Sequence, residues 1–331
     1  MFLAVGDFGV DLLGRRKAML LYTFLWSAAM LLFATTDSYL LLLVGMFFAM
    51  GTSTLLNTNM NLITTGMFAA APGFFVNFLF FIQGIGTSGS QYILVSHADG
   101  FAFWQHTNLV LLILGAVAFV LLLFCNVPEE AAGPADTPAQ KGGYDWRIIV
   151  PYVLVFGFYF IAEHGVMNWM VAYGVDGLGL PQASAAKYLS VFFGGMMIGR
   201  LCLSPLVDKL GALKSLAAFG GVSCVLYLIG SLGGAVTMPV WAISGLSFSI
   251  LYPTLVMSIR LYFPAQQVSG AAGTILSIAS LADILFNVGF GKLVDMAGYA
   301  VSIRVLPLSV LAFFIVFMLF TKFCKPTQKL K

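Results

Sequence analysis

Charged residues are scarce in this sequence. Only 9% of the 331 residues are Asp, Glu, Lys or Arg, whereas 60% are hydrophobic, and the mean hydropathy is +0.97. A water-soluble globule cannot bury so much apolar surface in its interior. The composition therefore excludes a soluble globular protein and indicates a chain whose solvent is lipid.

Several chemical signals are also missing. The four cysteines have no paired spacing, which argues against a disulfide framework or a zinc site. No Gly-x4-Gly-Lys-Ser/Thr loop is present to bind ATP phosphates, and no basic patch is present to bind nucleic acid. Residues 1–10 do not resemble a secretory signal, because no basic start precedes an apolar run and a cleavage site. We expect no cofactor and no metal.

Ten apolar stretches of about 20 residues recur along the chain, a length that spans the hydrocarbon core as a helix. They are apolar on every face, which favours helices over the alternating strands of a membrane barrel. The sequence thus predicts an all-α polytopic membrane protein. The predicted spans are 17–35, 39–64, 73–96, 104–125, 146–174, 184–206, 213–233, 237–262, 267–292 and 299–321.

The positions of the basic residues predict the orientation. If Arg15, Arg16 and Lys17 are cytoplasmic, ten spans place 12 of the 16 Lys and Arg residues on that side. We therefore expect a multi-pass protein of the cytoplasmic (inner) membrane with a cytoplasmic C-terminus.

The chain divides into two related parts. A hydrophilic segment rich in Ala, Pro and Gly predicts a cytoplasmic linker at 126–145, between an N-terminal part (1–125, four complete spans) and a six-helix part (146–331). The fragment "GVDLLGRRK" at 9–17 recurs as "LVDKLGALK" at 206–214, and Asp11/Asp208, Leu13/Leu210, Gly14/Gly211 and Lys17/Lys214 match at one offset of 197 residues. Duplicated helix bundles are typical of secondary transporters.

These fragments resemble a loop of the major facilitator superfamily. Asp11, Gly14, Arg15, Arg16 and Lys17 are similar to its loop between helices two and three, and Asp208, Gly211 and Lys214 to the copy between helices eight and nine. Two positions depart from the pattern, because Asp7 stands where the family has Gly and Leu12 where it has a basic residue. The resemblance implies that the ten spans are helices three to twelve of twelve. We expect that the natural gene extends upstream or that the chain is a truncated product.

Further stretches resemble the fucose permease branch of that superfamily. They are "SFSILYPTLVMSI" (247–259) with its Tyr252-Pro253-Thr254 kink, "MIGRL" (197–201), "NFLFFIQGIG" (77–86) and "GKLVDMAG" (291–298). In "LNTNMNL", however, Asn57 replaces the branch's coupling Glu and Leu62 its Pro, so proton symport does not transfer by resemblance. The resemblance implies a monomeric secondary transporter that moves a sugar or sugar-like solute by alternating access.

Four ionisable residues stand out inside the predicted spans, where a charge costs about 2.5–3.5 kcal/mol on insertion scales. We predict that Glu163, one turn from Tyr159, and Asp283 take part in substrate binding or ion coupling. Asp283 could pair with a base or, with Asn57, Asn61 and Asn287, offer oxygen ligands to sodium. His164 is a third coupling candidate, with a packing role as the alternative. Arg200 is expected to be a structural partner of Asp208 or of another carboxylate.

Polar and aromatic residues predict a site for a neutral, hydroxyl-rich solute. Side-chain amides both donate and accept hydrogen bonds, and aromatic rings stack on the apolar face of a sugar. Interfacial anchoring is the alternative for the aromatic residues. Glu163 and Trp169 face different directions unless Gly165 lets the helix unwind. Close helix packing is expected at Gly84, Gly86, Gly89, Gly195 and Gly199. The predicted solute-binding residues are Asn57, Asn61, Asn77, Gln83, Tyr159, Glu163, Asn168, Trp169, Tyr173 and Tyr252.

Two other classes of protein remain as alternatives. "GTSG" at 86–89 matches the Gly-x-Ser-Gly of intramembrane serine proteases, with Ser88 as nucleophile and His164 as base. A protease would not explain the duplication. A membrane protein that transports nothing is the second alternative, because two helices of the family are absent. We favour the transporter, which is not an enzyme.

Overall fold

The structure, a computed structural model, describes residues 13–67, 72–96, 100–126 and 145–326. These residues form helices, turns and bends, and each predicted span coincides with one helix or a short series of helices. Within these ranges, nine helical regions are long and apolar enough to cross a membrane. The predicted all-α polytopic class is confirmed.

The chain forms two compact units. The first unit comprises residues 1–79 and 97–135, and the second comprises residues 80–96 and 136–331. Helix α4 (Pro72–Ser96) is divided between them. The linker at 126–145 falls almost wholly outside the described residues, so the division there stays a prediction.

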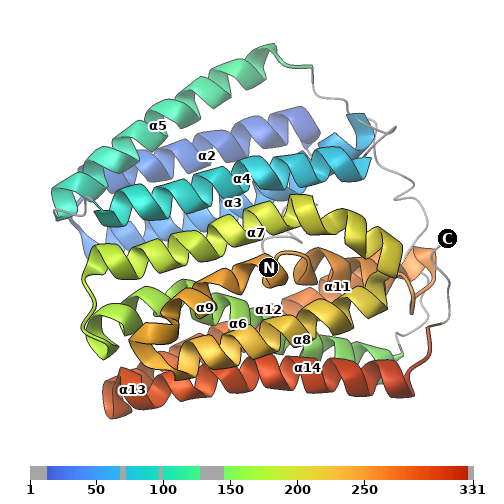
Figure 1. Cartoon of the computed structure of the whole chain (residues 1–331). Helices are drawn as coiled ribbons and strands as arrows, with labels where there is room; N and C mark the ends of the chain where they lie inside the picture. The colour runs from blue at the N-terminus through green and yellow to red at the C-terminus, as the bar shows by residue number, and fades with distance from the viewer. Residues whose placement is uncertain (1–12, 68–71, 97–99, 127–144, 327–331) are drawn as a thin grey trace. The chain divides into compact units, whose positions relative to one another are not determined.

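In the first unit, α2 (Arg15–Thr35) packs against both α3 (Tyr39–Met67) and α5 (Phe101–Phe124), as Figure 1 shows in blue and green. Ala29, Met30 and Phe33 of α2 form a small buried core, and the Phe33 ring lies 5.4 Å from that of Trp104. The Arg16 guanidinium donates a 2.6 Å hydrogen bond to the carbonyl of Leu123. This bond joins the start of α2 to the end of α5.

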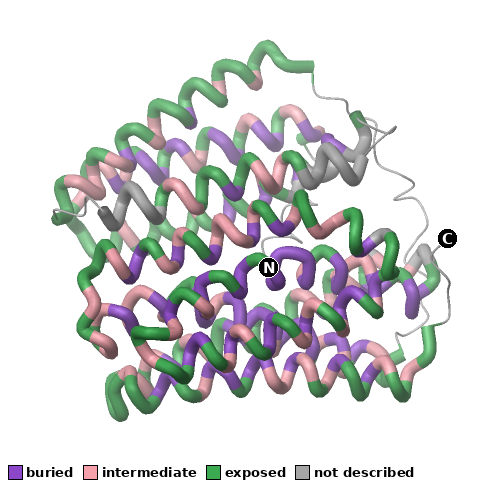
Figure 2. Tube along the Cα trace, viewed as in Figure 1, coloured by how far each residue is buried: buried purple, intermediate pink, exposed green. Residues whose placement is uncertain are grey.

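The second unit is built around α6 (Trp146–Ala172), which packs against α12, α14 and α7. Helix α6 is buried along much of its length. Figure 2 shows buried segments in purple among the helices of this unit. The other elements are η1 (Tyr173–Gly177), α7 (Gln182–Leu210), α8 (Ala212–Leu232), η2 (Gly234–Thr237), α9 (Met238–Ile243), α10 (Gly245–Phe248), α11 (Leu251–Ile259), α12 (Ala265–Ala297), α13 (Tyr299–Ser302), η3 (Ile303–Val305) and α14 (Leu306–Phe323).

The glycine of the duplicated fragment has the same backbone conformation in both copies. Gly14 before α2 has φ 77° and ψ 155°, and Gly211 before α8 has φ 80° and ψ 156°. Only glycine adopts this backbone region without strain. Both following helices have 21 residues, so their starts and their ends keep the 197-residue offset seen in the sequence. The sequence repeat is therefore also a repeat of local structure.

The kink expected near Tyr252 is present. The helix is interrupted between Phe248 and Leu251, and Pro253 lies in the first turn of α11, where its missing N–H is tolerated. Close glycine packing accompanies this break, because a Cβ at Gly245 would clash with the carbonyl of Phe192 on α7. The interruption thus lets α10 approach the backbone of α7.

The glycine expectations hold in part. An added Cβ would crowd neighbouring atoms at Gly84, Gly195 and Gly199, which confirms close packing there. At Gly86 and Gly89 it would meet nothing within 4 Å, so close packing was wrongly predicted. The helix does not unwind at Gly165, which was the condition for Glu163 and Trp169 to face the same direction. Helix α6 continues through this residue, and a Cβ there would lie 2.9 Å from Leu306.

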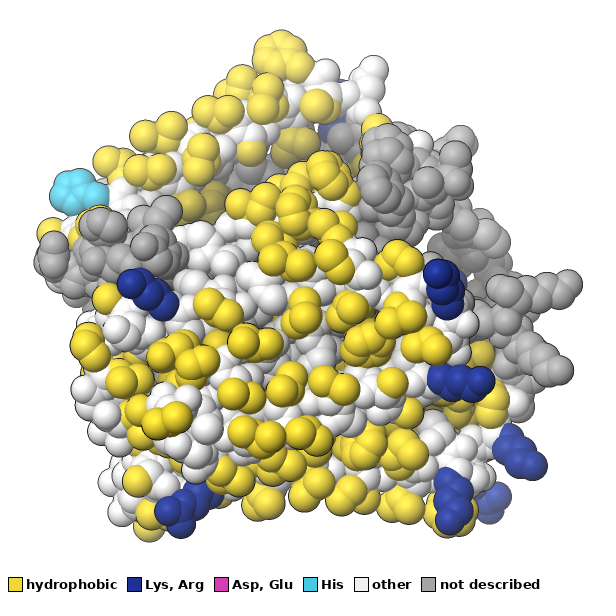
Figure 3. All heavy atoms as spheres, viewed as in Figure 1, with side chains coloured by type: hydrophobic (Ala, Val, Ile, Leu, Met, Phe, Trp, Pro, Cys, Tyr) yellow, Lys and Arg dark blue, Asp and Glu magenta, His cyan; other side chains and the backbone are white. Residues whose placement is uncertain are grey.

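The outer surface of the second unit is apolar. On the face drawn in Figure 3, hydrophobic side chains cover the middle of its helices, and Lys and Arg side chains lie toward the helix ends. Exposed Leu281, Ile284, Leu285 and Val288 on α12 belong to this kind of surface. Such a band is stable in lipid rather than in water.

Gly211→Ala is expected to lower the free energy of unfolding by about 1–3 kcal/mol, because alanine strains the backbone at φ 80°. Gly289→Ala is the matched control, since α12 has open space at this Cβ. Thermal unfolding of the purified protein in detergent measures both effects. Equal melting temperatures for the two variants would contradict the strain at the turn.

Candidate functional site

An acid and a base meet inside the second unit. His164 of α6 and Asp283 of α12 form an ion-pair contact of 2.6 Å between Nδ1 and Oδ2. The Asp283 side chain is 8% exposed and the His164 side chain 38%. The Phe160 ring lies parallel to the imidazole, with centroids 5.7 Å apart, and helps to hold its plane. The carboxylate is therefore buried, whereas the imidazole remains accessible.

Asn287, one turn after Asp283, extends this contact. Its Nδ2 donates to Asp283 Oδ1 at 2.9 Å and to the Asp283 carbonyl at 3.0 Å. Its Oδ1 accepts from Trp169 Nε1 at 2.9 Å and from Asn168 Nδ2 at 3.2 Å. A continuous hydrogen-bonded chain thus joins His164, Asp283, Asn287 and Trp169 across α6 and α12; we call it the α6–α12 polar chain.

Trp169 is held at the other end of this chain. Its indole packs against Phe290, with ring centroids 4.9 Å apart, and lies beside Gly291. Trp169 is half-buried and Asn168 is exposed. An aromatic face and an amide consequently stand next to each other on α6.

Glu163 belongs to a second polar group. It is buried at 9% exposure and interacts electrostatically with Tyr159, His164 and Arg200. The Tyr159 hydroxyl interacts with the Glu163 carboxyl group, and the Tyr159 ring stacks on that of Tyr252 at 6.4 Å. This cluster places one acid and two phenols together.

Arg200 carries the positive charge of this second group. It lies on α7, with its guanidinium 5.2 Å from the centre of the Phe80 ring. Within the described residues Arg200 forms no ion pair shorter than 4 Å. It interacts electrostatically with the Glu163 carboxylate. The expected pairing with Asp208 is not tested, because the side chain of Asp208 lies outside the description.

The other predicted solute-binding residues are placed separately. Tyr173 is buried and packs edge-on against Trp241, at 6.3 Å, which is a core position. Gln83 is exposed on the part of α4 in the second unit, and Asn57 is exposed in the first unit. The side chains of Asn61 and Asn77, and the whole of Asp11, lie outside the described residues.

The geometry gives no support to a serine protease. Ser88 donates its hydroxyl to the carbonyl of Ser190 at 3.0 Å, and His164 Nδ1 is occupied by Asp283. A nucleophile needs a base within hydrogen-bond reach. Each residue of the supposed dyad thus has another partner.

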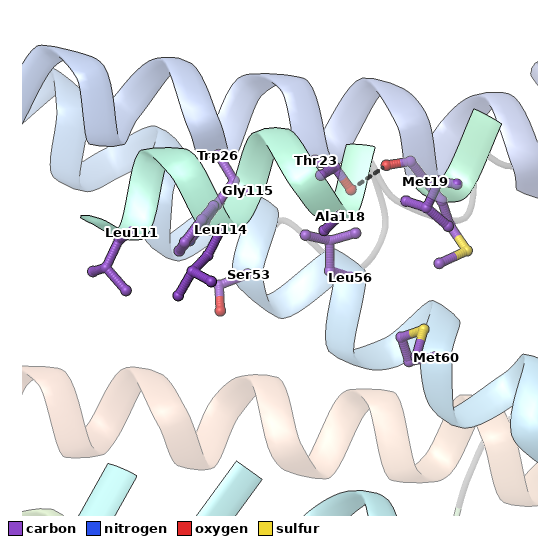
Figure 4. A pocket seen from close by; sticks show the side chains of 11 residues that line it. Met19, Thr23, Trp26, Ser53, Leu56, Met60, Leu111, Leu114, Gly115 and Ala118 are labelled. Atoms are coloured by element: carbon purple, nitrogen blue, oxygen red, sulfur yellow. Dashed lines mark hydrogen bonds between the residues drawn. The ribbon is translucent and has the colours of Figure 1, made fainter. Parts of the chain in front are cut away.

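A separate cavity of about 480 Å³ lies in the first unit, between α2, α3 and α5 (Figure 4). Its lining is mainly apolar, with Met19, Leu56 and Leu114 among its walls, and the hydroxyl of Thr23 is bonded to the Met19 carbonyl. No charged side chain lines it. A polar solute would therefore find few partners there.

The interior of the second unit is packed around α6. Tyr227 of α8 donates to the Ala162 carbonyl, and the Tyr159 ring contacts Phe248 of α10 and Phe313 of α14.

Comparison with known proteins shows the family. A Helicobacter pylori protein provisionally named a glucose/galactose transporter is 29% identical over 190 residues, 55% of this chain and 46% of that protein. The chain thus spans less than half of this relative's length. The fold is similar to the fucose:proton symporter FucP of E. coli (TM-score 0.67, 18% identity, 96% of this chain and 87% of that one).

It is also similar to a POT family transporter solved with a thioalcohol-conjugated peptide (TM-score 0.76, 13% identity, 97% and 85% covered). At such identities the likeness shows the fold alone. The sequence profile of the Major Facilitator Superfamily matches residues 2–282, most of the chain. The chain therefore belongs to the Major Facilitator Superfamily, a family of transporters rather than enzymes.

Proposed function

We propose that this protein transports a neutral, hexose-like sugar through the cytoplasmic membrane and couples its movement to protons. The observation that carries the proposal is the contact of His164 with Asp283 inside two membrane-spanning helices. The names of the matched relatives, a glucose/galactose transporter and a fucose:proton symporter, support the solute class. The family supports transport itself.

The acid–base pair suits a proton site. Because Asp283 Oδ2 faces His164 Nδ1, a neutral imidazole donates its Nδ1 proton to the carboxylate and leaves Nε2 as an acceptor. A second proton on Nε2 converts a net charge of −1 into a neutral ion pair. Since net charge within the hydrocarbon is costly, this step changes the relative stability of the protein's conformations.

The neighbouring groups suit a sugar. The Trp169 indole offers a flat face for the C–H surface of a pyranose, and the exposed Asn168 amide can both donate to and accept from hydroxyls. Glu163 faces another side of the unbroken helix, and it acts on His164 through its charge. The solute and the proton would then share one region of α6.

Sodium is the alternative coupling ion. In that role, Asp283 and Asn287 would supply oxygen ligands. The structure favours the proton, because a basic imidazole occupies one Asp283 oxygen and an amide NH₂ group occupies the other. Uptake with separately imposed proton and sodium gradients distinguishes the two ions.

His164→Gln is expected to abolish proton-driven accumulation of labelled glucose or galactose in proteoliposomes. Without the imidazole the coupled proton has no site, so the internal-to-external ratio should fall to about 1 while sugar exchange continues. His106→Gln is the matched control, because His106 is exposed and bonded only to the Ala102 carbonyl of its own helix.

The proton site would be refuted if His164→Gln still accumulated sugar to the level of the parent protein. Absence of any sugar uptake by the parent protein would contradict the transport proposal itself. Accumulation driven by sodium alone would assign the coupling to sodium.

Glu163→Gln is expected to remove gradient-driven accumulation and preserve exchange, since the neutral amide no longer stabilises the protonated imidazole next to it. Counterflow and accumulation assays on the same vesicles separate the two activities. Accumulation equal to that of the parent protein would remove Glu163 from the coupling mechanism.

A further inference from the structure

We propose that Asn287 is a positioning residue that relays the protonation of His164 to the indole of Trp169, so that proton binding releases the aromatic face for sugar. This inference rests on the proposed function for its physiological meaning. The relay itself is a property of the α6–α12 polar chain and can be tested without transport.

The direction of the relay follows from the donors and acceptors. An indole N–H only donates, so the Asn287 atom facing Trp169 must be the amide oxygen. The NH₂ group of Asn287 therefore faces Asp283, whose Oδ1 must accept. A mobile proton can consequently be shared only at the other carboxylate oxygen, Oδ2, where His164 lies.

Protonation of His164 then changes every bond along the chain. When the imidazole is neutral, both oxygens of the ionised Asp283 carry charge, and Oδ1 accepts a strong, charge-assisted bond from Asn287. A protonated imidazole draws the carboxylate charge toward Oδ2. The bond from Asn287 to Oδ1 weakens, the amide becomes less polarised, and its oxygen holds the Trp169 N–H less strongly.

The groups that face this pair are few within the described structure. His164 feels the charges of Asp283 on α12 and Glu163 on α6. Glu163 in turn interacts electrostatically with Arg200 on α7 and with Tyr159 on its own helix. Tyr252 of α11 interacts electrostatically with Glu163 and Arg200. A change in the charge of Glu163 would alter the proton affinity of His164. Glu163 itself is not a member of the hydrogen-bonded chain that reaches Trp169.

Tryptophan emission tests the relay directly. The chain has five tryptophans, so the Trp169 contribution is taken as the difference between the parent protein and Trp169→Phe. On acidification between about pH 8 and 5, the range in which histidines titrate, this difference emission should shift to shorter wavelength as the indole hydrogen bond weakens.

Asn287→Leu should abolish that shift, because the amide bridge is absent. His164→Gln should abolish it as well, because the titrating group is absent. Asn168→Ala is the matched control, since Asn168 bonds the same amide oxygen without lying between the acid and the indole. It should keep the shift.

The pH dependence of the KM for sugar distinguishes an effect on sugar binding from an effect on proton coupling. In the parent protein the KM for sugar should decrease as the pH is lowered. In Asn287→Leu the KM should no longer depend on pH. Trp169→Phe cuts the same hydrogen bond from its other end and packs similarly on Phe290, so it should also give a pH-independent KM if Asn287→Leu does not fold.

The two proposals can fail separately. A pH-dependent Trp169 emission that persists in Asn287→Leu would overturn the relay and leave proton-coupled transport standing. Loss of the emission shift in Asn287→Leu, in a protein that takes up no sugar, would support the relay and contradict the proposed function.

Discussion

A carboxylate inside a membrane-spanning helix is the constraint around which the second unit is organised. Asp283 lies in the middle of α12, where an unpaired charge would destabilise the folded protein by several kcal/mol. The structure satisfies one oxygen with His164 and the other with Asn287. The bond to His164, together with the bonds from Trp169 and Asn168 to Asn287, fixes α6 against α12 at this level. The proposed site follows from the need to compensate one acid.

The packing around α6 explains why the second unit can hold such a group. Helix α6 is surrounded by α12, α14 and α7, and its Gly165 allows Leu306 to approach closely. Packing on several faces provides both the burial and the rigidity that a polar chain requires. In the first unit, α2, α3 and α5 border a cavity with an apolar lining. The two units therefore share a turn geometry and differ in how their interiors are filled.

Much of the fold could be predicted from the sequence, because apolar length alone identifies membrane helices and one repeated fragment identifies the duplication. The four ionisable residues were recognisable for the same reason, since charge in an apolar stretch is conspicuous. The pairing of His164 with Asp283 was not, because the sequence did not identify the base with which Asp283 would pair. Asn287 was considered only as a cation ligand, although its i, i+4 spacing from Asp283 was a signal that the two side chains meet. Tyr173 could not be separated from the core, since aromatic residues serve both packing and binding.

The central claim is that the polar chain of α6 and α12 binds the proton that moves with the sugar. Electrical recording from proteoliposomes adsorbed on a solid-supported membrane tests it most directly. A rapid jump in glucose or galactose concentration, with no imposed gradient, should evoke a transient current that carries positive charge in the direction of sugar entry and grows as the pH falls. Sugar entry without such a current at any pH would contradict the account.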